Sequence, residues 1–163
     1  MNDIIYQQDL KLGLGNEDLV YDKIKIKYGD SMVKTTRWNK IDYYNDNVII
    51  ELKTRRNKYS AYPTTMIGKN KIDHMLESGK TAVGCFSFTD GLYFIEIDRE
   101  KLDKFELKQG GRFDRGRPEL NQYYYIPIDM LTKMWFNLKN WFRDILRYYG
   151  EYARLLEGVD IYY

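Results

Sequence analysis

Three charged side chains, Asp42, Glu51 and Lys53, are of the types that could together hydrolyse a phosphodiester bond. Mg²⁺ prefers oxygen ligands and usually takes one or two carboxylates, leaving its other positions to waters and phosphate oxygens. A bound Mg²⁺ polarises the phosphodiester and lowers the pKa of the attacking water. A lysine beside it can hold or deprotonate that water and stabilise the charge that develops on the phosphate. We therefore expect Asp42, Glu51 and the backbone carbonyl of Leu52 to bind Mg²⁺, or Mn²⁺ in its place, with Lys53 as the catalytic lysine.

A β-hairpin is the element that would bring these three side chains together. Residues 40–44 and 48–53 form two β-rich runs, and the Asn-Asp-Asn between them is a turn signal. A two-residue or a four-residue loop sets Asp42 opposite Glu51, whereas a three-residue loop would break that pairing. Side chains directly opposite have Cβ atoms roughly 4.5–5.5 Å apart. Lys53 follows Glu51 at the next position on the same face of the strand.

Further helices and strands surround this hairpin in the sequence. Glycines mark several helix ends, and apolar runs mark the strands. We expect, in chain order, a helix at 17–28, a strand at 31–38 that could continue into 39–44, an irregular stretch at 55–68, a helix at 70–78, strands at 81–88 and 92–97, a surface loop at 109–122, a strand at 123–128, and a long amphipathic helix from Asp129 to Tyr149.

Glu17 lies at the start of the first predicted helix, on the same helical face as Tyr21, Ile24 and Tyr28. One interpretation is a terminal glutamate at the edge of the core, where it compensates the helix dipole. The other is a further acidic residue at the metal site. The pattern leaves both interpretations open.

Asp42 and the tripeptide Glu51-Leu52-Lys53 resemble the motif of the PD-(D/E)xK nuclease superfamily, with Ile41 in the place of the proline. The resemblance covers roughly residues 15–98, and the layout looks closest to Holliday-junction-resolvase-like and phage or viral nucleases. It implies hydrolysis of nucleic acid at these residues, with a divalent cation as cofactor.

The resemblance also implies two further catalytic residues and a fold. Glu17 matches a glutamate that many members carry on the first helix, and Lys71 matches a lysine or glutamine on the helix after the motif. The fold implied is α/β (mixed α+β), a restriction-endonuclease-like core with a central mixed β-sheet flanked by helices. We expect residues 1–129 to form this core and residues 130–163 to form a helical C-terminal extension.

The chain after the hairpin is basic, which would suit nucleic acid. From Lys53 to Lys71 it has six basic residues and no acidic one, and such a run can attract a polyanion toward a metal site. An ordinary solvated loop would have the same composition. The residues expected to contact nucleic acid are Arg55, Arg56, Lys58, Tyr62, Thr64, Thr65, Lys69 and Arg115.

Composition excludes several other kinds of protein. The 163 residues suit one domain, and a formal net charge of +2 favours no particular partner. The single cysteine, Cys85, can form no internal disulfide, and the single histidine, His74, argues against Cys/His zinc sites and Ser-His-Asp triads. No early apolar stretch has the length of a signal peptide or a transmembrane helix. We therefore expect a protein of the cytoplasm or another reducing intracellular compartment, not a secreted one.

The expected function is Mg²⁺-dependent hydrolysis of DNA by an endonuclease. The alternative is a catalytically inactive nucleic-acid-binding module of the same fold. The C-terminal helix could pack on the core or pair in a homodimer. Its basic side, with Lys139, Arg143 and Arg147, could also contact a membrane surface, which is the less common use of such a helix.

Overall fold

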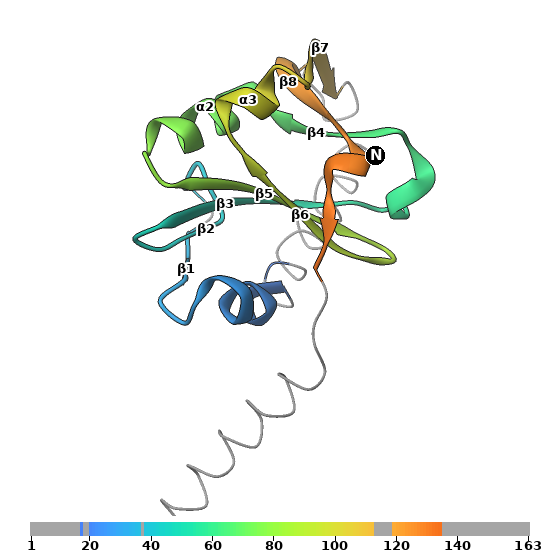
Figure 1. Ribbon diagram of the computed structural model, residues 1–163. Helices are drawn as coiled ribbons and strands as arrows, with labels where there is room; N and C mark the ends of the chain where they lie inside the picture. Colours follow the sequence, from blue (N-terminus) through green and yellow to red (C-terminus); the bar gives the residue numbers. More distant parts are fainter. Residues whose placement is uncertain (1–16, 18–19, 37, 113–118, 135–163) are drawn as a thin grey trace, which may run out of the picture.

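The computed structural model describes residues 17, 20–36, 38–112 and 119–134 (Figure 1). Residues 20–28 form the first helix, which ends at Gly29, whose φ of 102° lies in the region that favours glycine. The elements that follow are β1 (Val33–Lys34), β2 (Tyr43–Tyr44), β3 (Val48–Thr54), the 3-10 helix η1 (Tyr59–Ala61), β4 (Thr64–Gly68), α2 (Lys69–Glu77), β5 (Thr81–Phe88), β6 (Gly91–Ile97), α3 (Arg99–Leu102), β7 (Glu106–Arg112), β8 (Glu119–Pro127), the 3-10 helix η2 (Ile128–Met130) and β9 (Thr132–Lys133).

Six strands form a central mixed sheet in the order β1-β2-β3-β5-β6-β9. β3 and β5 are parallel, and the other neighbouring pairs in this sheet are antiparallel. Parallel neighbours need a long crossover connection, and this one contains β4 and α2. A central mixed sheet flanked by helices confirms the fold expected from the sequence, a restriction-endonuclease-like core.

The two faces of the central sheet are covered by different elements. One face packs against α2 and a second, three-stranded sheet of order β4-β8-β7, in a core that includes Ile49 and Ile72. The opposite face packs against the first helix, in a core that includes Ile50. Figure 1 shows these two layers on either side of the sheet. Because side chains alternate along a strand, Glu51 and Lys53 share the face of Ile49, toward α2.

The β2–β3 hairpin has the register expected from the sequence. Tyr43 pairs with Ile50 and Tyr44 with Ile49, which is the register predicted for this hairpin. Asp42 lies just before β2, where its N–H donates to the carbonyl of Ile50 at 3.1 Å. The hairpin therefore brings Asp42 to β3 and near the charge of Glu51, as predicted, although its N–H bond to Ile50 shows that the regular pairing ends at Tyr43.

The single strand predicted at 31–38, with its continuation into 39–44, is wrong. β1 and β2 are separate two-residue strands that pair with each other. The chain turns back between them, where the Asn39 N–H donates to the Thr36 carbonyl at 3.0 Å. Neither glycine nor proline marks this turn, so the sequence carries little signal for it.

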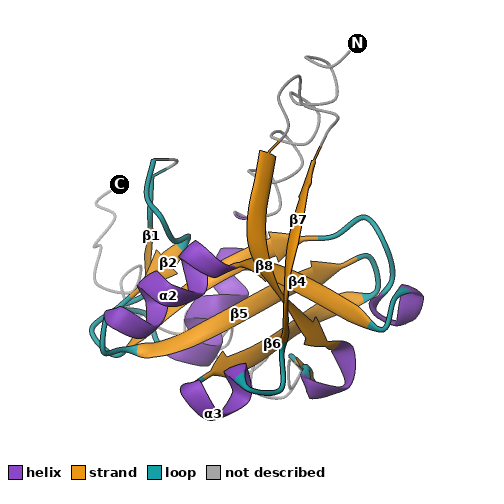
Figure 2. Cartoon of the chain, turned by 90° about the horizontal axis from the view of Figure 1, so that it is seen from above, coloured by secondary structure: helices purple, strands orange, loops and turns teal. Residues whose placement is uncertain are grey.

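Two segments predicted to be irregular contain strands. β4 occupies the end of the stretch 55–68, and the end of β7 pairs with the start of β8 within 109–122, where the sequence predicts a surface loop. β8 pairs with both β4 and β7. The backbone hydrogen bonds of a ladder do not require apolar side chains, so a polar, glycine-rich composition hides this pair of strands. Figure 2 shows the β7–β8 ribbon extending beyond the central sheet.

The long C-terminal helix does not begin at Asp129 as predicted. Ile128–Met130 is a 3-10 helix, and Leu131 after it has extended backbone, with φ −83° and ψ 138°. β9 then pairs with β6, and Leu131 and Met134 are buried. Residues 135–163 lie outside the described part of the chain, so the helical extension and its use in a homodimer stay predictions.

Replacing Gly84 by valine should lower the free energy of unfolding. Gly84 is the β5 partner of Glu51, and a Cβ there would lie 2.8 Å from Ile67 Cδ1 and 3.4 Å from Ile95 Cγ2. Adding methyl groups to a close-packed core costs about 1–3 kcal/mol. Urea denaturation measures the change, and Thr81→Val, at the exposed start of β5, is a control expected to stay within about 0.5 kcal/mol. Equal stability of Gly84→Val and the parent would show that the core around Gly84 can accommodate a larger side chain.

Candidate active site

Asp42 and Glu51 lie next to each other where the chain enters β2. The Asp42 Oδ2 accepts a hydrogen bond from the Leu52 N–H at 2.6 Å, which holds this carboxylate against β3. Burial first, and then the charge of Glu51, raises the pKa of Asp42 to about 7, although the Leu52 hydrogen bond and Lys53 oppose the shift. Two carboxylates in one desolvated place repel each other, and either a proton or a cation relieves that repulsion.

Glu51 is buried in β3, with 1% of its surface exposed, and two lysines approach it. The Lys53 ammonium donates a hydrogen bond to Oε1. The Lys71 Nζ lies 3.5 Å from Oε2, which is an ion pair without the geometry of a hydrogen bond. Among the described residues, Oε2 therefore has no hydrogen-bond partner although it is fully buried. Buried charges are usually paired and hydrogen-bonded, so this oxygen is available to one more ligand.

Lys71 reaches Glu51 from a distant part of the sequence. It lies in the first turn of α2, which follows β4 directly. Its ammonium also donates to the carbonyl of Lys40, two residues before Asp42. Lys71 thus connects α2, the chain that leads into β2, and the buried carboxylate of β3.

Glu17 lies at the edge of this cluster. Its Oε2 is 3.3 Å from the Lys34 Nζ of β1, and its backbone carbonyl accepts a hydrogen bond from the Tyr43 hydroxyl at 2.7 Å. Its charge makes a small contribution to the raised pKa of Asp42. Glu17 is therefore near Asp42 but paired with Lys34, and its place in the catalytic set stays a prediction.

The groups around Asp42 and Glu51 fit a hard divalent cation. No group of three or more His, Cys, Asp and Glu side chains suited to a metal occurs within the described residues, so a cation would depend on these two carboxylates. The Leu52 N–H points to Asp42, and a residue in a strand directs its N–H and C=O to the same side, so the Leu52 carbonyl faces this site too. Two carboxylates and one carbonyl match Mg²⁺, which keeps several positions for waters and phosphate oxygens.

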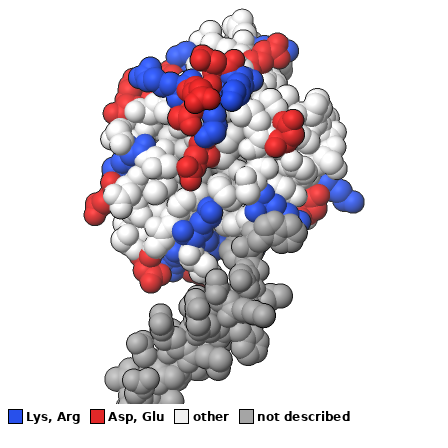
Figure 3. All heavy atoms as spheres, viewed as in Figure 1, with Lys and Arg blue, Asp and Glu red and all other residues white. Residues whose placement is uncertain are grey.

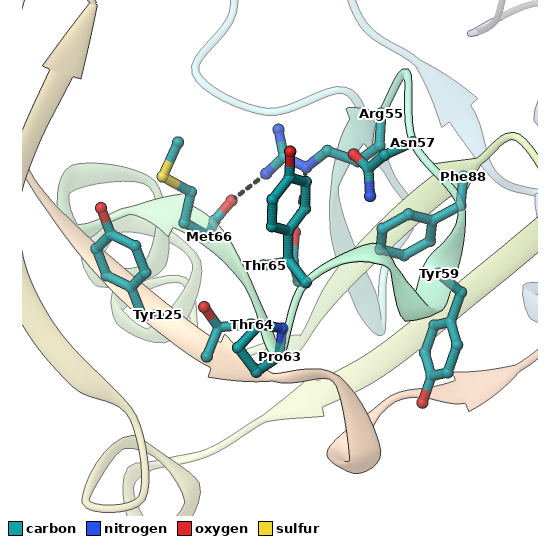
Figure 4. A pocket seen from close by; sticks show the side chains of 10 residues that line it. Arg55, Asn57, Tyr59, Pro63, Thr64, Thr65, Met66, Phe88 and Tyr125 are labelled. Atoms are coloured by element: carbon teal, nitrogen blue, oxygen red, sulfur yellow. Dashed lines mark hydrogen bonds between the residues drawn. The ribbon is translucent and has the colours of Figure 1, made fainter.

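Three of the residues predicted to bind nucleic acid make contacts within the protein. The Arg55 Nε donates to Thr65 Oγ1 at 3.1 Å and its Nη2 donates to the Met66 carbonyl at 2.6 Å, which ties the end of β3 to β4 (Figure 4). Burial lowers the pKa of the Arg55 guanidinium. Lys69 pairs with Asp73 one turn along α2. These contacts give Arg55, Thr65 and Lys69 structural roles beside any role in binding.

The other predicted nucleic-acid contacts lie nearer the surface. Arg56, Lys58 and Tyr62 are exposed, and Thr64 is half-buried at the start of β4. Arg115 lies outside the described residues. On the face drawn in Figure 3, acidic and basic side chains are interspersed and do not form one basic patch. Binding of nucleic acid by these residues stays a prediction.

Two further groups at the candidate active site, the Lys34 ammonium and the Lys40 carbonyl, could not be identified from the sequence. Lys34 lies in a short strand predicted only as part of a longer one, and its pairing with Glu17 depends on β1 lying beside the first helix. The Lys40 carbonyl is backbone, and no residue type indicates it. Only the tertiary structure identifies both.

The family model described as "Phage putative PDDEXK endonuclease" matches residues 12–134, which is more than half of the chain. The matched segment contains Asp42, Glu51, Lys53 and Lys71. No curated protein matches. No helix in the described part of the chain is long and apolar enough to cross a membrane.

Proposed function

Because this chain belongs to the phage putative PDDEXK endonuclease family and is therefore a nuclease, we propose that it hydrolyses phosphodiester bonds of DNA at Asp42, Glu51 and Lys53. One observation carries the proposal. The buried Glu51 has an oxygen without a hydrogen-bond partner among the described residues, and it lies beside a second carboxylate and two lysines. Such a cluster of buried charges does not stabilise the fold, whereas a metal-dependent nuclease requires it.

The two carboxylates are the proposed ligands of the cation. Asp42, Glu51 and the Leu52 carbonyl would hold Mg²⁺, with Mn²⁺ as a substitute of similar preference for oxygen. When bound, the cation would polarise the phosphodiester and favour deprotonation of the attacking water. The Leu52 N–H keeps Asp42 oriented toward Glu51, so the oxygen ligands are placed before the cation arrives.

Lys53 is the proposed catalytic lysine. Its side chain is 30% exposed and its ammonium lies at the Glu51 carboxylate, so Lys53 can reach both the site and the solvent from which water and DNA enter. There it would hold the attacking water and stabilise the negative charge that develops on the phosphate. Lys71 would hold Glu51 from the opposite side and tie α2 to the chain before Asp42.

Cleavage of closed circular DNA tests the proposal, because a circle without ends is cut only by an endonuclease. We expect nicking of supercoiled plasmid with Mg²⁺ or Mn²⁺ and none with EDTA. Linear, branched and single-stranded DNAs of matched sequence would define the preferred form, and an RNA of the same sequence would test the choice of DNA. Salt-sensitive binding of DNA without cleavage of any form in either metal would instead indicate an inactive nucleic-acid-binding module.

A further inference from the structure

A cavity of about 370 Å³ opens just beyond the end of β3, the strand that carries Glu51 and Lys53. Its walls come from the connection between β3 and β4, from β4 itself, and from single residues of β5 and β8 (Figure 4). Its volume falls within the range of about 300–1,000 Å³ that is usual for sites of small organic groups. The polar and aromatic residues that matter most are Arg55, Asn57, Tyr62, Thr64 and Tyr125.

Arg55 forms a rigid wall of this cavity. Its guanidinium is held by the hydrogen bonds to Thr65 and Met66, and it lies 5.9 Å from the centre of the Phe86 ring. A guanidinium fixed in this way keeps its plane while a ligand enters. Flat aromatic ligands, including nucleobases, stack on arginine planes.

Tyr62 supplies an aromatic ring at the solvent side. It lies at the cavity with 64% of its surface exposed, which is unusual for a large ring and is exceeded among the described large hydrophobic residues only by Trp38. A ring that stays in water gains little for folding but can stack on a base. Asn57 and Thr64 add an amide and a hydroxyl, which are the groups that hydrogen-bond with the edges of bases.

One strand of nucleic acid could contact both this cavity and the candidate active site. The Arg55 N–H donates to the Ser87 carbonyl at 2.8 Å, so the ladder between β3 and β5 continues to Arg55. Every second residue of a strand lies on the same face, so this face carries Glu51, Lys53 and Arg55 in turn. At about 3.3 Å per residue, Arg55 is roughly 13 Å from Glu51 along the strand. With a rise of ~3.4 Å per nucleotide in a stacked strand, this spans at most about four nucleotides.

We propose that this cavity binds one unstacked base of the DNA, a few nucleotides from the bond that is cut. Bases inside a duplex are stacked and cannot enter such a cavity, so the preferred substrate carries an unpaired nucleotide near the cleavage point, as in a branch, a bulge or a single strand. The inference rests on the proposed function and specifies the class of its substrate.

DNA binding without cleavage tests the inference. Fluorescence anisotropy in EDTA compares a labelled oligothymidine strand with a strand of the same length that carries abasic sites in place of bases. We expect the parent to bind the base-bearing strand more tightly, and Tyr62→Ala to reduce this preference about tenfold, by loss of one stacking contact. Tyr62→Phe keeps the ring and should keep the preference. Tyr44→Ala, an exposed tyrosine on β2 that does not line the cavity, should also keep it.

The outcomes separate the inference from the proposed function. If Tyr62→Ala discriminates between the two strands as the parent does, the base-binding cavity is wrong, whatever the nuclease activity. If the parent binds both strands equally, the cavity is wrong as well. The nuclease proposal falls separately, if the parent cleaves no DNA with Mg²⁺ or Mn²⁺ or if substitution of Lys53 leaves cleavage unchanged.

Discussion

Replacing Lys53 by methionine should reduce the rate of DNA cleavage by roughly 100- to 10,000-fold at saturating Mg²⁺, which is the usual contribution of a positioned proton-transfer group. Methionine keeps the unbranched, flexible shape of the side chain but removes the ammonium that donates to Glu51. The lost group is the one proposed to hold the attacking water and to stabilise charge on the phosphate. Single-turnover cleavage of plasmid DNA measures the effect on the chemical step.

Two measurements show whether this loss is chemical or structural. Circular dichroism in Mg²⁺ should match that of the parent, because Lys71 still pairs with Glu51 from the other side. Lys101→Met removes an ammonium from a more exposed ion pair, with Asp98 at 2.8 Å, on the short helix α3. That control should cleave like the parent. Undiminished cleavage by Lys53→Met would remove Lys53 from the site.

Replacing Asp42 by asparagine should abolish Mg²⁺-dependent cleavage and at the same time stabilise the metal-free protein at pH 8. An amide is a poor ligand for Mg²⁺ in place of a carboxylate. It has no charge to desolvate, however, and its oxygen can still accept the hydrogen bond from the Leu52 N–H. We therefore expect the negative charge of Asp42 to lower the stability of the folded protein and to be required for DNA cleavage.

The raised pKa of Asp42 determines whether the free energy of unfolding rises or falls with pH. Burial and the charge of Glu51 raise the pKa of Asp42 to about 7 in the folded protein, against about 3.9 in an unfolded chain. Between these values the folded state binds more protons, so the free energy of unfolding falls as pH rises from about 4 to about 7 and stays low above it. The loss is of the order of a few kcal/mol. The Asp42→Asn protein lacks this decrease.

Urea denaturation at pH 5 and pH 8 in EDTA measures this difference, and Mg²⁺ adds a second readout. Mg²⁺ at pH 8 should raise the melting temperature of the parent, because a ligand of the folded state stabilises it, and should not raise that of Asp42→Asn. Asp46→Asn, in the exposed turn of the same hairpin, should follow the parent in every respect. Equal pH dependence of the parent and Asp42→Asn would contradict a desolvated carboxylate at this position.

Local signals in the sequence were sufficient for the elements with strong apolar periodicity. The prediction of a helix at 70–78 matches α2 to within one residue at each end, and β5 has the predicted bounds 81–88. The positive φ of Gly79, 70°, agrees with its predicted place after that helix. In these segments the side chains themselves decide the structure, since each buries its own apolar face.

The strand predicted at 123–128 matches the end of β8, but β4, β7 and the start of β8, which are held mainly by backbone pairing, were not predicted. β4, β7 and β8 form a second sheet whose register depends on three segments separated by up to several dozen residues. Hydrogen bonds between N–H and C=O groups are available to almost any sequence, so residue types alone do not show which segments pair. The start of the C-terminal helix failed for a related reason, because Thr132–Lys133 joins β6 as a strand despite its place in a helical pattern.

The sequence by itself indicated that Asp42, Glu51 and Lys53 belong to one hairpin, because two β-rich runs flank a turn signal and strand alternation sets Glu51 and Lys53 on one face. It left the loop length open, and the structure decided the register. Only the tertiary structure decided what surrounds them. The packing of α2 over β3 brings Lys71 to Glu51, and the second sheet turns Arg55 inward to Thr65. Local geometry can place neighbours along a strand, but burial and contacts across layers arise only when distant segments exclude water together.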